Sequence, residues 1–114
     1  MRRKFIRGAI AASAALQFAV AMPASAGGQS GLDIAKSNAC MGCHAVDRKL
    51  VGPSFQQIAG KYKGDARAGA RLAVKVKDGG SGVWGVIPMP GHPRMSDADI
   101  RTVVAWVLAG APEK

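Results

Sequence analysis

The pentapeptide Cys40-Met41-Gly42-Cys43-His44 is the feature that most constrains this chain. Two thiols three positions apart lie on one face of a helical turn, so both sulfurs can reach the two vinyl groups along one porphyrin edge. The histidine directly behind the second thiol then falls beneath the iron, where its imidazole can serve as an axial ligand. The spacing therefore predicts a covalent haem c, attached through Cys40 and Cys43, with His44 on the iron.

The same side chains have two other interpretations. A Cys-x-x-Cys pair can form a disulfide or a thiol redox site, but such pairs usually follow a strand, and nothing upstream of Cys40 has a strand pattern. A zinc site is the second, with Cys40, Cys43, His44 and His92 as ligands. A histidine adjacent to the second cysteine would strain a tetrahedral zinc site, so haem attachment is the prediction we retain.

The N-terminal quarter differs in character from the rest of the chain. Basic residues gather in positions 1–7, an uncharged Ala-rich run covers residues 8–21, and residues 24–26 (Ala-Ser-Ala) fit a small-x-small cleavage site. This is the pattern of a secretory signal peptide, and the apolar run is shorter than the roughly 20 residues of a spanning helix. We expect a cleavable signal at 1–26 and one domain at 27–114, without stable membrane insertion.

The export route has two candidates. Arg2-Arg3 followed by Phe5-Ile6 resembles a twin-arginine signal, which exports proteins already folded. If haem is attached after export, the apoprotein should cross unfolded, which favours the general secretory route. Either route predicts a periplasmic protein.

The mature chain is small for a self-sufficient core. A domain of this size buries only about 60–65% of its unfolded surface and usually needs a staple such as a cofactor. Both cysteines belong to the haem motif, and only 5% of the residues are aromatic. The haem is therefore expected to supply much of the missing apolar core.

The mature chain is basic. The whole chain has a formal charge of +9, and without residues 1–26 it keeps 12 basic and 7 acidic residues, a net charge of +5. Two haem propionates would lower this further, leaving a surface suited to acidic faces on partner proteins. A merely solvated basic surface is the alternative. The export signal argues against nucleic acid as a partner.

Four helices and no strands are expected in the mature chain. Apolar spacing and capping residues place them at about 31–39, 54–62, 65–77 and 96–108, the third capped by Asp65. The last is the clearest, and its apolar stripe comprises Ile100, Val103, Val104, Val107 and Leu108. We expect it to pack across the first helix and to close an all-α fold around the haem.

The turn Val51-Gly52-Pro53 is expected to support the axial histidine. Pro53 has no backbone N–H to donate, but its carbonyl can accept a hydrogen bond. An axial histidine usually donates its second ring proton to such an oxygen, which fixes the tautomer and raises the basicity of the ligand. We therefore predict that the Pro53 carbonyl accepts from His44, with an ordinary loop proline as the alternative.

The segment 83–95 contains three prolines and neither a helical nor a strand period, so it is expected to be a structured loop. Flanking prolines in Pro88-Met89-Pro90 restrict how the methionine is presented. Met89 is therefore the predicted sixth iron ligand, and a thioether opposite histidine raises the reduction potential.

Three other side chains compete with Met89. Met95 directly precedes a helix cap, and Met41 lies inside the attachment loop, where it cannot cross to the opposite face of the haem. His92 is the serious competitor, and bis-histidine ligation would lower the potential.

With these residues in place, the chain resembles the short bacterial class I cytochromes c, the cytochrome c-551/c-552 group of small electron carriers. The resemblance covers about residues 32–108. Its motifs are Cys-x-x-Cys-His at 40–44, Val51-Gly52-Pro53, Gly82-Val83-Trp84-Gly85 and Ile87-Pro88-Met89-Pro90. It implies a class I cytochrome c fold of four short helices around one haem c, with thioether bonds from both cysteines and His44 and Met89 as axial ligands.

The resemblance also implies roles for two residues near the haem propionates. The Trp84 indole N–H would reach one of them, which agrees with the need of a buried indole for an acceptor. Lys75 matches a basic position near the other. The chain departs from the family after Met89, where the segment 90–95 (Pro-Gly-His-Pro-Arg-Met) is one residue longer than the usual one and lacks its asparagine. His92 either replaces that asparagine beside the ligand sulfur or faces solvent.

A six-coordinate haem leaves no iron position for a substrate, so the expected function is one-electron transfer between redox partner proteins, without enzymatic activity. We expect a monomer that docks through the exposed haem edge near Lys36 and Lys49. Two alternatives stay open. The chain could be the electron-accepting subunit of a periplasmic dehydrogenase, or its haem could bind gas or peroxide at a labile sixth position.

Overall fold

The computed structural model describes residues 28–113, so the predicted signal segment and its cleavage site lie outside the described residues. Within that range the chain forms four α-helices, one 3₁₀ turn and no strand. These elements are α1 (Gly31–Ser37), η1 (Cys40–Gly42), α2 (Phe55–Lys61), α3 (Ala68–Asp78) and α4 (Asp97–Leu108). The prediction of an all-α fold with four short helices is confirmed. None of the described helices is long and apolar enough to span a membrane.

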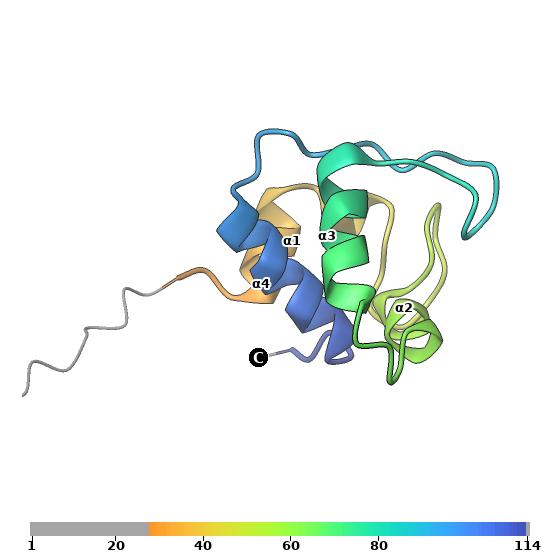
Figure 1. The fold of residues 1–114 in the computed structure, drawn as a ribbon, viewed down its shortest axis with the longest axis horizontal. Helices are drawn as coiled ribbons and strands as arrows, with labels where there is room; N and C mark the ends of the chain where they lie inside the picture. The colour runs from red at the N-terminus through yellow and green to blue at the C-terminus, as the bar shows by residue number, and fades with distance from the viewer. Residues whose placement is uncertain (1–27, 114) are drawn as a thin grey trace, which may run out of the picture.

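Helix α4 is the centre of the fold. It packs against α1, α2 and α3 (Figure 1), and its buried side chains form one core with residues of α1 and α2. This core comprises Ile34, Ala35, Phe55, Met95, Ile100, Val103, Val104, Trp106, Val107 and Ala111. The predicted packing of the last helix across the first is confirmed, and α4 also forms one wall of the cavity described below.

The contact between α1 and α4 depends on Gly31. A Cβ at Gly31 would lie 2.1 Å from the Cβ of Trp106, so only glycine lets the two helices approach this closely. Trp106 is 8% exposed, and its indole Nε1 donates to the Pro112 carbonyl at 2.8 Å. The predicted stripe missed Trp106 and included Leu108, which is only partly buried. The buried face of α4 includes Trp106 because Gly31 leaves space for its side chain.

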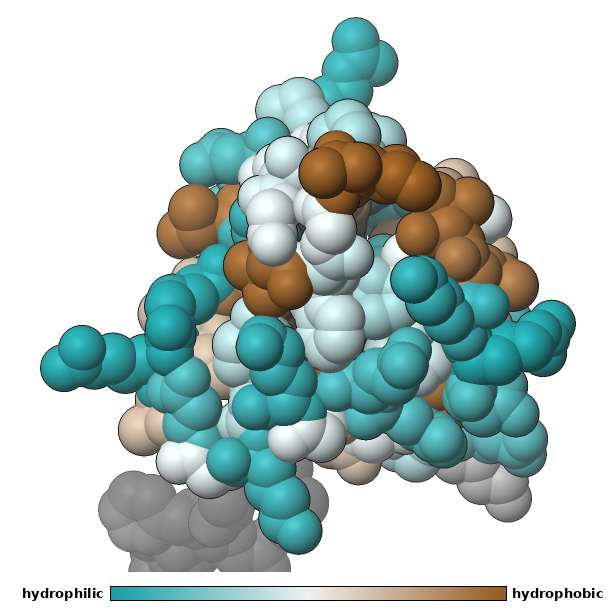
Figure 2. Space-filling view, turned by 90° about the vertical axis from the view of Figure 1, so that its right-hand side faces the viewer, coloured by the Kyte–Doolittle hydropathy of each residue, from teal (hydrophilic) through white to brown (hydrophobic). Residues whose placement is uncertain are grey.

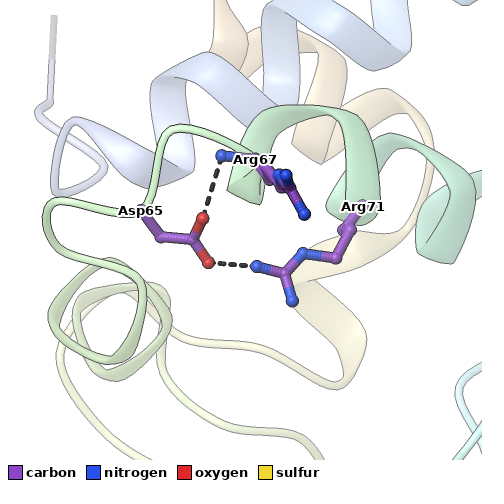
Figure 3. Close-up of polar contacts among 3 residues, drawn as sticks. All are labelled: Asp65, Arg67 and Arg71. Carbon is purple, nitrogen blue, oxygen red and sulfur yellow. Dashed lines mark hydrogen bonds and ion pairs between the residues drawn. The ribbon is translucent and has the colours of Figure 1, made fainter.

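The prediction that Asp65 caps the third helix is wrong. Helix α3 begins at Ala68, and its N-cap residue is Arg67, which makes no side-chain capping bond. The Asp65 carboxylate instead accepts from the backbone N of Arg67 at 2.9 Å and pairs with the guanidinium of Arg71 (Figure 3). A carboxylate bonded to the amide two residues ahead closes an Asx turn, and this turn delays the start of the helix.

The segment between α3 and α4 is a structured loop, as predicted. In Figure 1 it extends from the upper end of α3 to the right and returns over the top of the molecule to α4. Two hydrogen bonds join its two limbs, from Gly80 N to Met89 O at 3.0 Å and from Met89 N to Gly80 O at 2.8 Å. Both backbone groups of Met89 are thereby fixed.

Candidate haem site

A cavity of about 660 Å³ lies between the helices and the loops at 49–53 and 80–90. This volume falls within the roughly 300–1,000 Å³ usual for cofactor sites. Its lining is mostly apolar. The larger aliphatic and phenylalanine side chains on it are Leu50, Val51, Phe55, Ile58, Leu72, Val76, Val83, Val86, Ile87, Val103, Val104 and Val107. An apolar ligand body is the kind of group that such walls can bury.

All the residues predicted for the site line this one cavity. They are Cys40, Cys43, His44, Pro53, Trp84 and Met89. These residues come from four separate stretches of the chain, and the fold brings them together around the same space. His92 is absent from the lining.

The 3₁₀ turn η1 presents the two cysteines. The backbone N–H groups of Cys43 and His44 both donate to the Cys40 carbonyl, at 3.2 and 3.0 Å, so the motif closes into one tight turn. Both thiols are free; that of Cys40 is half-buried and that of Cys43 is exposed. Burial raises the pKa of the Cys40 thiol. The zinc alternative loses its support, because among residues 28–113 no group of three or more His, Cys, Asp or Glu side chains is arranged to hold a metal ion.

The imidazole of His44 is held from two sides. Only 8% of the residue is exposed, and its Nδ1 lies 2.6 Å from the Pro53 carbonyl oxygen. A carbonyl oxygen can only accept, so Nδ1 carries the proton and the lone pair of Nε2 stays free to coordinate a metal. The ring of Phe55 stacks on the imidazole, with centroids 5.2 Å apart and planes 22° from parallel.

Phe55 is a site residue that the sequence reasoning missed. Its position in the helix expected at about 54–62 is compatible with an ordinary core residue, and apolar spacing alone does not indicate that it stacks on His44. The signal lies in Ser54-Phe55-Gln56-Gln57, where Ser54 and Gln57 form a full capping box. This box fixes the first turn of α2, and Phe55 is the first residue of that turn, two positions after Pro53. Trp106 packs against Phe55 edge to face, with ring centroids 5.3 Å apart, and so holds it in place.

Gly52 faces the same imidazole. A Cβ at this position would lie 2.6 Å from His44 Cε1 and 2.9 Å from Nδ1. We expect Gly52→Ala to displace the ring from Pro53 and to destabilise the protein by about 1–3 kcal/mol, the usual cost of overpacking. Thermal unfolding of the haem protein measures this effect. The control is Gly60→Ala in α2, where a Cβ meets nothing within 4 Å, and an equal loss of stability in both variants would contradict the contact.

Trp84 and Lys75 also line the cavity. Trp84 is 43% exposed, and the Lys61 ammonium lies 5.6 Å from its ring centroid, within cation–π range. Lys49 and Lys75 are the basic residues on the described lining, and none of the lining residues is acidic. The cavity therefore suits a ligand with an apolar body and anionic edge groups, which are the properties of haem.

The rim of the cavity is an exposed apolar surface. Figure 2, which views the right-hand side of Figure 1, shows several hydrophobic groups in its upper part with hydrophilic groups around and below them. The large exposed apolar side chains of the described residues that line the cavity are Leu50, Val51, Val83, Trp84, Val86 and Ile87, and Val86 is 91% exposed. Apolar surface of this kind marks a place where a ligand or a partner binds.

A helical domain with a Cys-x-x-Cys-His turn and a methionine on one apolar cavity has the architecture of a c-type cytochrome. A family model described as cytochrome c matches residues 29–111. The chain is 49% identical over 80 residues to cytochrome c-551 of Azotobacter vinelandii, which covers 70% of this chain and 96% of that protein. It is 48% identical over 80 residues to cytochrome c-552 of Nitrosomonas europaea, covering 70% and 78%.

A solved structure agrees with these relatives. The crystal structure of wild-type Nitrosomonas europaea cytochrome c552 superimposes with a TM-score of 0.66 at 47% identity, covering 68% of this chain and 96% of the other. The chain therefore belongs to the cytochrome c family, as a short class I cytochrome c. Members of this family carry a covalently attached haem c with its iron and serve in electron transport.

Proposed function

We propose that this protein is a periplasmic one-electron carrier and not an enzyme, with His44 and Met89 as the axial ligands of its haem iron. One observation carries the proposal: these two residues line the same cavity as both cysteines. When bound, the haem supplies a ferric/ferrous couple that accepts and releases a single electron. Ligation by two side chains leaves no iron position for a substrate, so the protein needs neither a general base nor a nucleophile.

The remaining residues would attach and orient the haem. Cys40 and Cys43 would hold it through thioether bonds, and the Pro53 carbonyl keeps the His44 imidazole in the tautomer that frees Nε2. Trp84 would donate its indole N–H to one propionate. Lys75, on the lining of the same cavity, would place a positive charge near the other.

Protein-film voltammetry tests the proposed function. A carrier should give one reversible wave with a Nernst slope of about 59 mV per decade, the value for a single electron. Added peroxide should leave this wave unchanged, because both axial positions are filled. A catalytic current with peroxide would contradict the carrier function and favour an open sixth position.

Purification distinguishes a free carrier from a dehydrogenase subunit. A free carrier should elute as a monomer at high salt, where contacts between exposed charges are screened. A stoichiometric partner that stays bound at high salt would instead favour the subunit interpretation.

The docking surface is proposed to be the apolar rim of the cavity, with an acidic face on the partner. Lys49 lies on the cavity lining beside Leu50 and Val51, two of the exposed apolar side chains. Lys36 lies in the last turn of α1, outside the cavity lining, so it contributes only to the wider basic surroundings. Weak and salt-sensitive contacts of this kind suit a carrier that must leave after each electron transfer.

We expect Lys49→Gln to slow the bimolecular reaction with an acidic redox partner roughly twofold or more at low ionic strength, because a rim charge mainly affects the association rate. The difference should vanish near 1 M salt, where the Debye length is about 3 Å. Stopped-flow mixing at several salt concentrations measures the effect. The control is Arg101→Gln, an exposed α4 residue that does not line the cavity. Equal slowing in both variants would contradict a docking role for Lys49.

His92 provides a test of the competing ligation. Its side chain does not line the cavity, and its buried Nδ1 has no hydrogen-bond partner. We therefore expect His92→Gln to keep the absorption spectrum and the potential of the wild-type protein. Loss of the low-spin six-coordinate spectrum in this variant would instead identify His92 as the sixth ligand.

A further inference from the structure

The loop that carries Met89 lies against the C-terminal end of α3 without side chains between the two backbones. Gly80 and Met89 exchange both of their backbone hydrogen bonds. Two residues beyond Pro90, the backbone N of His92 donates to the carbonyls of Val76 and Lys77, at 2.9 and 3.1 Å. The returning limb of the loop therefore satisfies carbonyl groups that the end of α3 leaves free.

Two glycines make this approach achievable from opposite sides. A Cβ on Gly79 would lie 2.4 Å from the Met89 carbonyl oxygen and 2.6 Å from the Gly91 nitrogen. A Cβ on Gly91 would lie 2.8 Å from the Lys77 carbonyl oxygen and 2.8 Å from the carbonyl carbon of Asp78. The obstructing atoms are all backbone atoms, which cannot rotate away as a side chain can.

The rest of the returning limb is held independently of these glycines. The Lys77 ammonium donates to the Met95 carbonyl at 2.9 Å and lies 3.6 Å from the Asp97 carboxylate. We therefore expect an added methyl group at Gly79 or Gly91 to displace the loop backbone near Met89. The junction with α4 should stay in place.

We propose that Gly79 and Gly91 are positioning residues for the sixth iron ligand. By letting the loop backbone rest directly on α3, they set how far Met89 reaches into the cavity and hence the strength of its bond to the iron. This inference rests on Met89 as the axial ligand, as proposed above. An alanine at either glycine lifts the loop from α3, weakens the iron–sulfur bond and lowers the reduction potential, because thioether ligation is what raises it.

The chain offers a matched control for Gly79. Its φ of +74° is itself unfavourable for alanine, and Gly64 has nearly the same φ, +78°, with nothing within 4 Å of an added Cβ. Gly64→Ala therefore places alanine at nearly the same positive φ as Gly79→Ala but without the collision. Gly91 does not have a positive φ. Gly91→Ala therefore introduces the collision without that backbone strain.

The experiment measures the reduction potential and the affinity of the oxidised haem proteins for imidazole, which must displace the methionine sulfur to bind. Gly79→Ala and Gly91→Ala should have lower potentials than the wild type and bind imidazole roughly tenfold more tightly, a factor that corresponds to about 1.4 kcal/mol. Gly64→Ala should lose thermal stability but keep both wild-type values.

Three results would overturn the inference. One is a wild-type potential and imidazole affinity in both Gly79→Ala and Gly91→Ala. The second is an equal change in Gly64→Ala, which would assign the effect to lost stability. The third is failure of both variants to take up haem while Gly64→Ala does so, since the glycines would then be needed for folding itself. A wild-type protein without methionine–iron absorption would instead remove the proposed ligation.

Discussion

Replacing Met89 by alanine is expected to lower the reduction potential by on the order of 0.1 V, a fraction of the roughly 0.8 V over which axial ligands set haem potentials. Thioether ligation favours ferrous iron, and no other methionine of the described residues is in place to supply it. Met41 and Met95 do not line the cavity, and Met95 is 7% exposed within the core. The vacated sixth position should also let the reduced protein bind carbon monoxide.

Voltammetry and carbon monoxide titration of Met89→Ala measure these two effects. Met95→Leu is the control, since it alters a methionine of the same loop that packs into the core and does not reach the cavity. It should keep the wild-type potential and resist carbon monoxide. An unchanged potential in Met89→Ala would remove this residue from the iron.

Loss of haem attachment is expected to unfold the domain. Without the haem, the apolar lining of the cavity of about 660 Å³ would be exposed to water, and apolar surface in water costs roughly 25 cal/mol per Å². A typical domain has a total stability of only about 5–15 kcal/mol, so a small domain has little reserve against this loss. We therefore expect Cys40→Ala/Cys43→Ala, freed of haem, to give the far-ultraviolet circular dichroism of an unfolded chain.

Gly42→Ala is the control for this double variant. Gly42 lies between the two cysteines, and a Cβ there meets nothing within 4 Å. It should keep covalent haem, as mass spectrometry of the denatured protein would show, together with native helicity. Cooperative thermal unfolding of the haem-free double variant would contradict the view that the haem supplies much of the core.

The features that could be predicted from the sequence are those that local chemistry determines. Two cysteines and a histidine at fixed spacing define one turn, and Pro88 and Pro90 restrict how Met89 is presented. The helices follow from apolar periodicity and caps, and α1, α2 and α4 begin close to their predicted positions. In each case the decisive atoms lie within a few residues of one another.

The features that could not be predicted depend on contacts between distant segments. Trp106 is buried because Gly31, far away in the chain, leaves space for it. Phe55 supports His44 only because α4 places Trp106 against its edge. Asp65 had the correct composition for an N-cap, but an Asx turn and the pairing with Arg71 competed for its carboxylate. Side-chain preference alone does not decide such competitions.

The glycines around Met89 illustrate the same limit. A glycine-rich segment at 79–82 predicts the end of a helix, and this prediction is correct. The sequence does not reveal that Gly79 lies against the Met89 backbone, because that contact forms only when the loop returns to α3. The role that we propose for these residues can be inferred only from the folded chain.

The absorption spectrum of the oxidised wild-type protein at neutral pH tests the central claim most directly. Ligation of the iron by His44 and Met89 predicts a weak band at the red end of the spectrum from methionine sulfur, and this band should be absent from Met89→Ala. The reduced wild-type protein should show no spectral change with carbon monoxide. Absence of the red band from the wild type, or carbon monoxide binding at neutral pH, would contradict the proposed carrier.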